Sequence, residues 1–248
     1  MTTPRIGCVK YLNARPLIHG WLGPVDFDHP AALCRKLAGG ELDVALVSSI
    51  EYLRRPQYRV VDGISISAFG PVYSVVVAHR QERATLREIA IDPASETSSA
   101  LLRCLLAQHQ MHSRLVSEAH SGARLLIGDQ AIRFRQENPE ERFWDLAEDW
   151  KNVTALPFVF ALWLLRPEVA NAAEIAHRLR SLREENLERI NQLIARTSDF
   201  DSEFCRRYFT ENIRFEFGEQ EKAGLREFHR RCLKSEINVA PGYELNLV

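Results

Sequence analysis

The sequence predicts an α/β fold, because short apolar runs of strand length repeatedly lead into helical patterns. The first run breaks at Asn13, and Pro16 then begins a helical pattern, since the first turn of a helix tolerates a residue without an amide hydrogen. A second run, residues 44–47, is apolar on both faces, as in parallel strands that helices cover. Open sheets of this kind bind ligands beyond the carboxyl ends of their strands.

Polar residues stand at the ends of these runs. Asn13 is expected beside a helix N-terminus, where backbone amides favour anions. Ser48 and Ser49 follow the second run and open the next helix, so each hydroxyl could either cap that helix or face a ligand. Ser74 precedes a third apolar run, residues 75–78. Four polar side chains are therefore candidates for one binding site.

The order of the patterns predicts two lobes, one of them interrupted by the other. Residues 1–82 form the first part of lobe 1, and we expect residues 64–69 and 75–78 to form a pair of strands leading toward the second lobe. Lobe 2 is expected over residues 83–157, with strands at 89–91 and 125–127 and helices near 97–109 and after Gly128. A cleft between the lobes is then the expected ligand site.

The apolar run at residues 158–165 is too short to span a membrane and is predicted to return to lobe 1 as a buried strand. Residues 158–248 complete that lobe, mainly with helices. Ile213, Phe215 and Phe217 alternate as in a short strand, and a final helix is expected over residues 219–234.

Charge and termini restrict the class of partner. The 248 residues carry 32 basic and 33 acidic side chains, so no overall field attracts nucleic acid or an acidic membrane. The first residues lead directly into a strand without an apolar signal region, which favours a cytoplasmic location. We expect a small-molecule ligand, no nucleic acid and no membrane partner; the oligomeric state is left open.

The five cysteines are odd in number, widely spaced and without a CxxC pair, which predicts neither a disulfide framework nor a zinc site. We expect no metal and no cofactor. None of the eight histidines occupies a recognisable position for a general base, so core or surface roles are expected for them.

Six segments carry a family resemblance, in this order: YLNARPL (11–17), GELDVALVSSIEYL (40–53), GPVYS (70–74), DPASETS (92–98), LLIGD (125–129) and LPFVFALW (156–163). Together they resemble the chorismate dehydratases of the futalosine route to menaquinone. The resemblance implies a two-lobed type II periplasmic-binding-protein-like fold with the ligand in the cleft between the lobes. The dihydroxynaphthoate synthase of the same pathway shares this fold and is one alternative; a non-catalytic cytosolic binding module for a small carboxylate is another.

The resemblance implies that chorismate loses water to give 3-[(1-carboxyvinyl)oxy]benzoate. We expect Asn13 and Ser74 to lie closest to the reacting atoms, where they hydrogen-bond to a carboxylate or to the departing hydroxyl. The expected carboxylate binders are Ser48, Ser49, Thr97 and Ser98, with helix capping as the alternative.

Asp129 is expected to be either a helix cap or a carboxylate in the cleft. Because no general base stands out, one hypothesis is that the enolpyruvyl carboxylate of the substrate itself accepts the proton. The protein would then contribute positioning and electrostatics.

Overall fold

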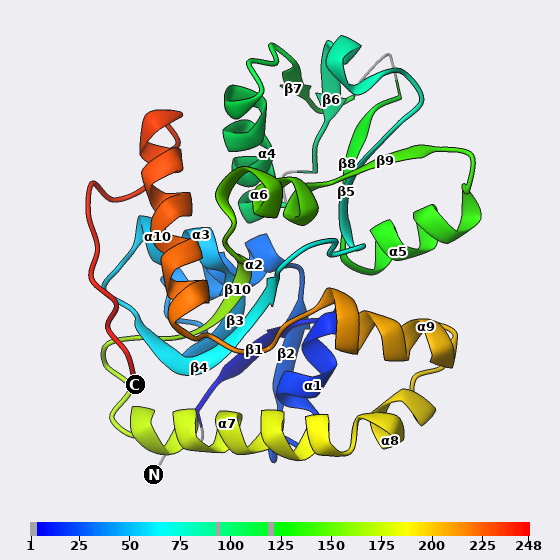
Figure 1. The fold of residues 1–248 in the computed structure, drawn as a ribbon. Coiled ribbons are helices and arrows are strands. Elements are labelled where there is room, and N and C mark those ends of the chain that lie inside the picture. The colour runs from blue at the N-terminus through cyan, green and yellow to red at the C-terminus, as the bar shows by residue number, and fades with distance from the viewer. Residues whose placement is uncertain (1–3, 93–94, 119–121) are drawn as a thin grey trace.

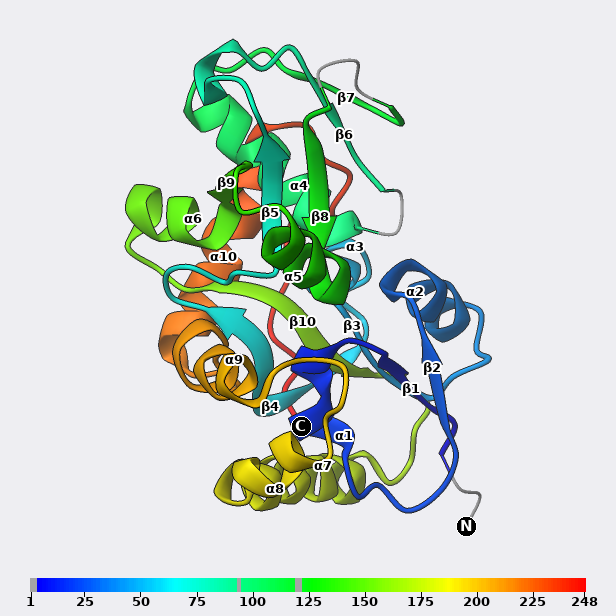
Figure 2. The same cartoon turned by 90° about the vertical axis from the view of Figure 1, so that its right-hand side faces the viewer.

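The computed structural model describes residues 4–92, 95–118 and 122–248, and these form two lobes, each built on a five-stranded sheet (Figures 1 and 2). Pro93 and Ala94 of the DPASETS segment lie outside the described residues.

The sheet of the first lobe has the strand order β2-β1-β3-β10-β4. β1 pairs in parallel with β2 and β3, whereas β10 is antiparallel to β3 and β4. The strands span Ile6–Val9 (β1), Val25–Asp28 (β2), Val44–Ser48 (β3), Arg59–Ala68 (β4) and Phe158–Leu165 (β10). β3 is buried along its whole length, as its continuous apolar run predicts.

The sheet of the second lobe has the order β7-β6-β8-β5-β9. Its strands span Val75–His79 (β5), Glu88–Ala90 (β6), Arg114–Val116 (β7), Arg124–Ile127 (β8) and Arg142–Asp145 (β9). Because β5 belongs to this sheet, the expected pairing of residues 64–69 with 75–78 is wrong. The chain crosses between the sheets after Ala68 and before Val75, and it returns at β10.

Helices cover both sheets (Figure 1). Those of the first lobe span Arg15–Ile18 (α1), Pro30–Ala38 (α2), Ser49–Arg54 (α3), Ala172–Glu188 (α7), Ile190–Ala195 (α8), Ser202–Arg207 (α9) and Glu219–Lys234 (α10). Those of the second lobe span Glu96–Gln108 (α4), Gly128–Glu137 (α5) and Leu146–Thr154 (α6). Short turns span Leu12–Ala14 (η1, 3-10), Arg83–Thr85 (η2, 3-10) and Tyr208–Asn212 (η3, π).

The alternating residues Ile213, Phe215 and Phe217 are buried but do not form the expected strand. The segment makes a single bridge, between Ser67 and Arg214, whose backbone groups exchange hydrogen bonds of 2.9 and 2.8 Å. The alternation of apolar and polar residues here reflects an extended segment with one buried and one exposed side. The segment is not part of a continuous β-ladder.

All five cysteines are buried and carry free thiols. Within the described ranges, no helix combines the length and the apolar composition that crossing a bilayer requires.

Candidate active site

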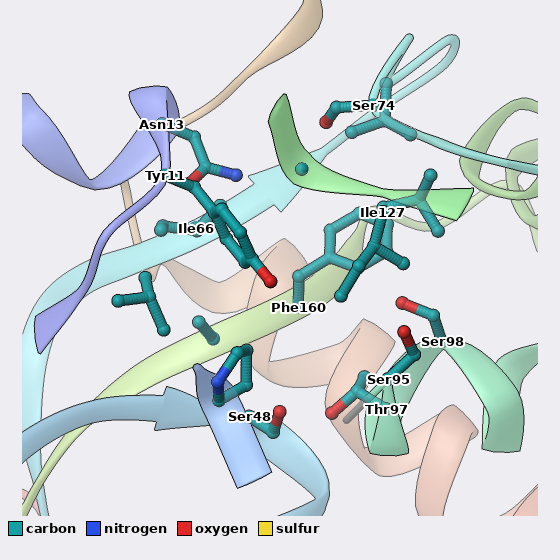
Figure 3. A pocket seen from close by; sticks show the side chains of 16 residues that line it. Tyr11, Asn13, Ser48, Ile66, Ser74, Ser95, Thr97, Ser98, Ile127 and Phe160 are labelled. Atoms are coloured by element: carbon teal, nitrogen blue, oxygen red, sulfur yellow. The ribbon is translucent and has the colours of Figure 1, made fainter. Parts of the chain in front are cut away.

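A cavity lies between the lobes, with about 550 Å³ of empty space including its mouth. Figure 3 shows its polar side chains in two groups, with Asn13 and Ser74 at one end and four hydroxyl residues at the other. Apolar and aromatic side chains lie between these groups: Tyr11, Ile66, Ile127 and Phe160. Apolar walls with a few convergent polar groups are typical of a small-molecule site.

Asn13 lies in the η1 turn between β1 and α1, and its side chain lines the cavity. Pro16 stands in the first turn of α1, as the sequence predicts. The buried Oδ1 of Asn13 has no hydrogen-bond partner among the described residues. Because buried polar atoms are rarely left unpaired, this oxygen lacks a donor that it would normally have.

Ser74 is fully buried at the other side of the same end of the cavity. The residue before it, Tyr73, has a φ of 65°, which is uncommon for a side chain of this size. The Asp145 carboxylate holds this loop by accepting the amide hydrogens of Val72 and Tyr73, at 3.1 and 2.8 Å. Backbone strain held by surrounding contacts is found at functional sites, and here it directs Ser74 into the cavity.

Tyr208 is a residue of this site that the sequence analysis missed. It is fully buried in the π-helical turn η3, and its hydroxyl donates a hydrogen bond of 2.7 Å to Ser74 Oγ. Burial raises the pKa of the phenol, and contacts with Ser74 and Asn13 oppose this rise. Because the Ser74 oxygen accepts from Tyr208, its own hydrogen is free to point at a ligand.

The hydroxyl residues at the far end of the cavity are Ser48, Ser95, Thr97 and Ser98. Ser48 ends β3 and precedes α3, but its side chain makes no capping bond, so the capping alternative does not describe it. Thr97 Oγ1 accepts the amide hydrogen of Ile50 at 3.3 Å and thereby links α4 to α3. Ser95 was not predicted, and its buried Oγ has no partner among the described residues. Its place in the DPASETS segment, two residues before Thr97, was the available signal.

Two of the predicted residues do not line the cavity. Ser49 is fully buried and donates to the carbonyl of Val159 at 2.7 Å, which is a contact within the core of the first lobe. Asp129 Oδ1 accepts the amide hydrogen of Leu12 at 2.8 Å, and it caps no helix, because Ile127 occupies the N-cap of α5. Burial raises the pKa of the Asp129 carboxyl, and the Leu12 hydrogen bond opposes this rise.

Tyr11 is the one ionisable side chain among the described lining residues. Burial, with smaller contributions from the Asp92 and Asp129 carboxylates, raises its pKa to about 12, so it is protonated at neutral pH. Across the described part of the chain, no group of three or more histidine, cysteine, aspartate or glutamate side chains is arranged to hold a metal ion. The arrangement therefore offers neutral hydrogen-bond donors and acceptors rather than a charged acid or base.

Comparison with solved structures gives the fold of this chain. The chain superposes on the crystal structure of protein AF1704 from Archaeoglobus fulgidus with a TM-score of 0.76 at 18% identity, covering 94% of this chain and 98% of that one. It superposes on the periplasmic aliphatic sulphonate binding protein SsuA from Escherichia coli with a TM-score of 0.66 at 14% identity, covering 98% and 90%. The fold is therefore that of the periplasmic binding proteins, as expected.

Sequence comparison gives the family. Residues 4–234 match the family model described as menaquinone biosynthesis, and the chain belongs to this family. A chorismate dehydratase from Thermus thermophilus is 32% identical over 254 aligned positions, covering 90% of this chain and 93% of the relative. A chorismate dehydratase from Campylobacter jejuni is 29% identical over 224 positions, covering 90% of both chains. The resemblance on which the sequence analysis rested is thus confirmed.

Proposed function

We propose that this protein is a chorismate dehydratase, a hydro-lyase that converts chorismate to 3-[(1-carboxyvinyl)oxy]benzoate and water. The observation that carries the proposal is the cavity itself, in which Asn13 and Ser74 face each other across apolar walls. A ligand that donates a hydroxyl hydrogen to Asn13 Oδ1 and brings a polar group to Ser95 Oγ would pair both atoms. Chorismate has this form, since its two carboxylates and its hydroxyl surround an apolar ring.

In this proposal the ring lies against the apolar wall that includes Tyr11 and Phe160. The hydroxyls of Ser48, Ser95, Thr97 and Ser98 hold one carboxylate through neutral hydrogen bonds.

At the other end, the carbon that bears the enolpyruvyl ether loses its proton, and the neighbouring carbon loses hydroxide. The Nδ2 group of Asn13 and the hydroxyl of Ser74 donate hydrogen bonds to the groups on which negative charge develops, which lowers the barrier because these donors are already oriented. The Ser74 hydrogen is directed to the departing hydroxyl, since Tyr208 occupies the serine oxygen as donor. Aromatisation of the ring then drives the elimination forward.

The proton acceptor in this proposal is the enolpyruvyl carboxylate of the substrate. The described lining supports this step, because its one ionisable group, Tyr11, is a protonated phenol at neutral pH. Binding places the carboxylate next to the proton, and such positioning replaces a general base of the protein. The carboxyl group so formed passes the proton to the departing hydroxide, which leaves as water.

The futalosine pathway and a cytoplasmic location belong to the same proposal. They are supported by the match to the menaquinone biosynthesis family and by cysteines that are all buried free thiols.

Incubation with chorismate separates an enzyme from a binding module. Purified protein is mixed with chorismate, and the aromatic product is followed by ultraviolet absorbance and identified by mass spectrometry. In parallel, calorimetry measures the binding of chorismate to the wild-type protein and to the Ser74→Ala variant. A chorismate dehydratase forms one equivalent of product per equivalent of chorismate, over many turnovers. Calorimetric binding of intact chorismate by the wild-type protein, without product, would instead identify the binding module.

A further inference from the structure

The Gly128–Asp129 pair joins the two residues that face the reacting atoms. The Gly128 amide donates to the carbonyl of Ser74 at 2.8 Å, and the Asp129 carboxylate accepts the amide of Leu12 at 2.8 Å. Leu12 directly precedes Asn13 in the η1 turn. One dipeptide at the start of α5 therefore holds both Ser74 and the turn that carries Asn13.

This connection crosses between the lobes. α5 belongs to the second lobe and η1 to the first, and Figures 1 and 2 show α5 beside the first-lobe segment that leads into α1. The Leu12 amide lies at the start of a 3-10 turn, where amides lack a partner within the turn, so the carboxylate satisfies a donor that would otherwise be unpaired.

The absence of a side chain at Gly128 allows the lobes to approach this closely. Its φ is +58°, and a Cβ atom built there would lie 2.8 Å from Cγ and Cδ1 of the Tyr11 ring. Tyr11 and Gly128 both line the cavity, so the contact between them is part of its wall.

We propose that Asp129 is a positioning residue, whose carboxylate locks the Asn13 turn against the Ser74 loop and so assembles the reacting end of the cavity when the lobes meet. The inference rests on the proposed function only for its kinetic readout. Asp129 does not contact the ligand in this account, because it does not line the cavity. Its Oδ1 accepts the Leu12 amide, and in this proposal the carboxylate transfers no proton.

Two substitutions at Asp129 distinguish positioning from proton transfer. Asp129→Asn keeps a carbonyl oxygen that can accept the Leu12 amide, whereas Asp129→Ala removes it. We expect Asp129→Ala to lower kcat about tenfold or more with a smaller change in KM, and Asp129→Asn to recover kcat to within about threefold of wild type. Glu137→Ala, at the exposed end of the same helix, is the matched control and should leave both constants unchanged.

A second readout does not depend on turnover. Exchange of the Leu12 amide hydrogen, followed by NMR, should be slow in the wild type and in Asp129→Asn but fast in Asp129→Ala, while core amides of β3 stay protected in all three. If the wild-type protein does not convert chorismate, the proposed function fails. The exchange experiment still tests whether Asp129 holds the Leu12 amide.

Three results would overturn the inference. The first is that Asp129→Asn has a kcat as low as that of Asp129→Ala although its Leu12 amide is still protected from exchange. This result would indicate proton transfer by Asp129. The second is wild-type kcat in Asp129→Ala, and the third is an unchanged Leu12 exchange rate in that variant. Circular dichroism and melting curves establish that each variant is folded.

Discussion

At the scale of single residues, neighbouring serines have different tasks. Ser48 lines the cavity, whereas the hydroxyl of Ser49 donates a hydrogen bond to the carbonyl of Val159. The pair thus gives a matched comparison between a cavity-lining hydroxyl and a core contact one residue apart.

We expect Ser48→Ala to raise KM for chorismate with little change in kcat, because a hydrogen bond to a distant carboxylate is made equally in the ground and transition states. Ser49→Ala should leave KM near wild type and lower the free energy of unfolding by about 1–3 kcal/mol, since the Val159 carbonyl loses its buried donor. Steady-state kinetics and denaturant titration measure both effects. An unchanged KM in Ser48→Ala would remove Ser48 from the site.

Tyr208→Phe removes the donor to Ser74 while keeping the ring in place. The Ser74 hydroxyl can then turn toward other acceptors, so we expect kcat to fall about three- to tenfold, the value of one neutral hydrogen bond, with less change in KM. Phe209→Leu, at the next position, serves as a packing control. Full activity in Tyr208→Phe would show that Ser74 is oriented without the phenol.

Sequence patterns identified the site residues whose position is set by their neighbours in the chain. Asn13, Ser48, Ser74, Thr97 and Ser98 each lie at or near the end of a strand or the start of a helix or strand, and all line the cavity. The partners that hold them could not be predicted in this way.

Tyr208 reaches Ser74 from 134 positions away, and the Asp129 carboxylate reaches Leu12 from 117 positions away. No local spacing encodes such contacts.

At the scale of elements, the long uniform patterns were predicted well. The strand at 158–165 and the helix at 219–234 have the expected limits. The errors fell on segments that leave the regular ladder. The alternation at 213–217 produces only one bridge, and the strands at 59–68 and 75–79 separate into different sheets because the chain changes lobe between them.

Helix α10 packs tightly on the turn that precedes β10. A Cβ atom at Gly224 would lie 2.0 Å from the carbonyl oxygen of Pro157, so Gly224→Ala must displace the helix. We expect a loss of about 1–3 kcal/mol of unfolding free energy, or a fall in Tm of several degrees.

Gly242→Ala is the control for that substitution, because a Cβ atom there meets nothing within 4 Å. It should change stability by less than about 0.5 kcal/mol. Equal Tm values for the two variants would contradict the packing argument.

Glu227 pairs with two arginines of its own helix, α10, and one of them, Arg231, also contacts the second lobe. Hydrogen bonds from Arg230 and then Arg231 lower the pKa of Glu227 to about 2, while partial burial opposes the change, and Arg231 also donates to Gln108 of α4. A carboxyl with a lowered pKa stabilises the fold above its ordinary pKa of 4.5, and this contribution is lost as pH falls toward 2.

We therefore expect Glu227→Gln to be less stable than wild type by about 1 kcal/mol at pH 7, since exposed ion pairs contribute little. The difference should shrink as pH falls from 4.5 toward 2. Urea titrations at several pH values measure it, with Glu137→Gln as the control. A difference that stays constant down to pH 2.5 would contradict the assignment.

At the scale of the whole molecule, the lobes touch on both sides of the cavity. Asp129 accepts from Leu12 on one side, and Thr97 accepts from Ile50 on the other, where Arg54 also pairs with Glu96. Opening of such a cleft by hinge motion is the expected behaviour of a two-lobed fold.

Ligand binding should therefore reduce the radius of gyration, because the contacts between lobes form around the occupied cavity. Small-angle scattering with and without saturating 3-[(1-carboxyvinyl)oxy]benzoate measures the change. Superimposable profiles would indicate a rigid, preformed site.

In the proposed mechanism, the cavity accelerates loss of water from chorismate through Asn13 and Ser74. The direct measurement is kcat for the aromatic product in wild type, Asn13→Ala and Ser74→Ala at saturating chorismate. A hydrogen bond made to the transition state is worth about 2.7–4 kcal/mol, so each variant should turn over about a hundred- to a thousandfold more slowly, with KM changed far less. Near-wild-type kcat in Asn13→Ala and Ser74→Ala, or no aromatic product from the folded wild-type protein, would contradict the claim.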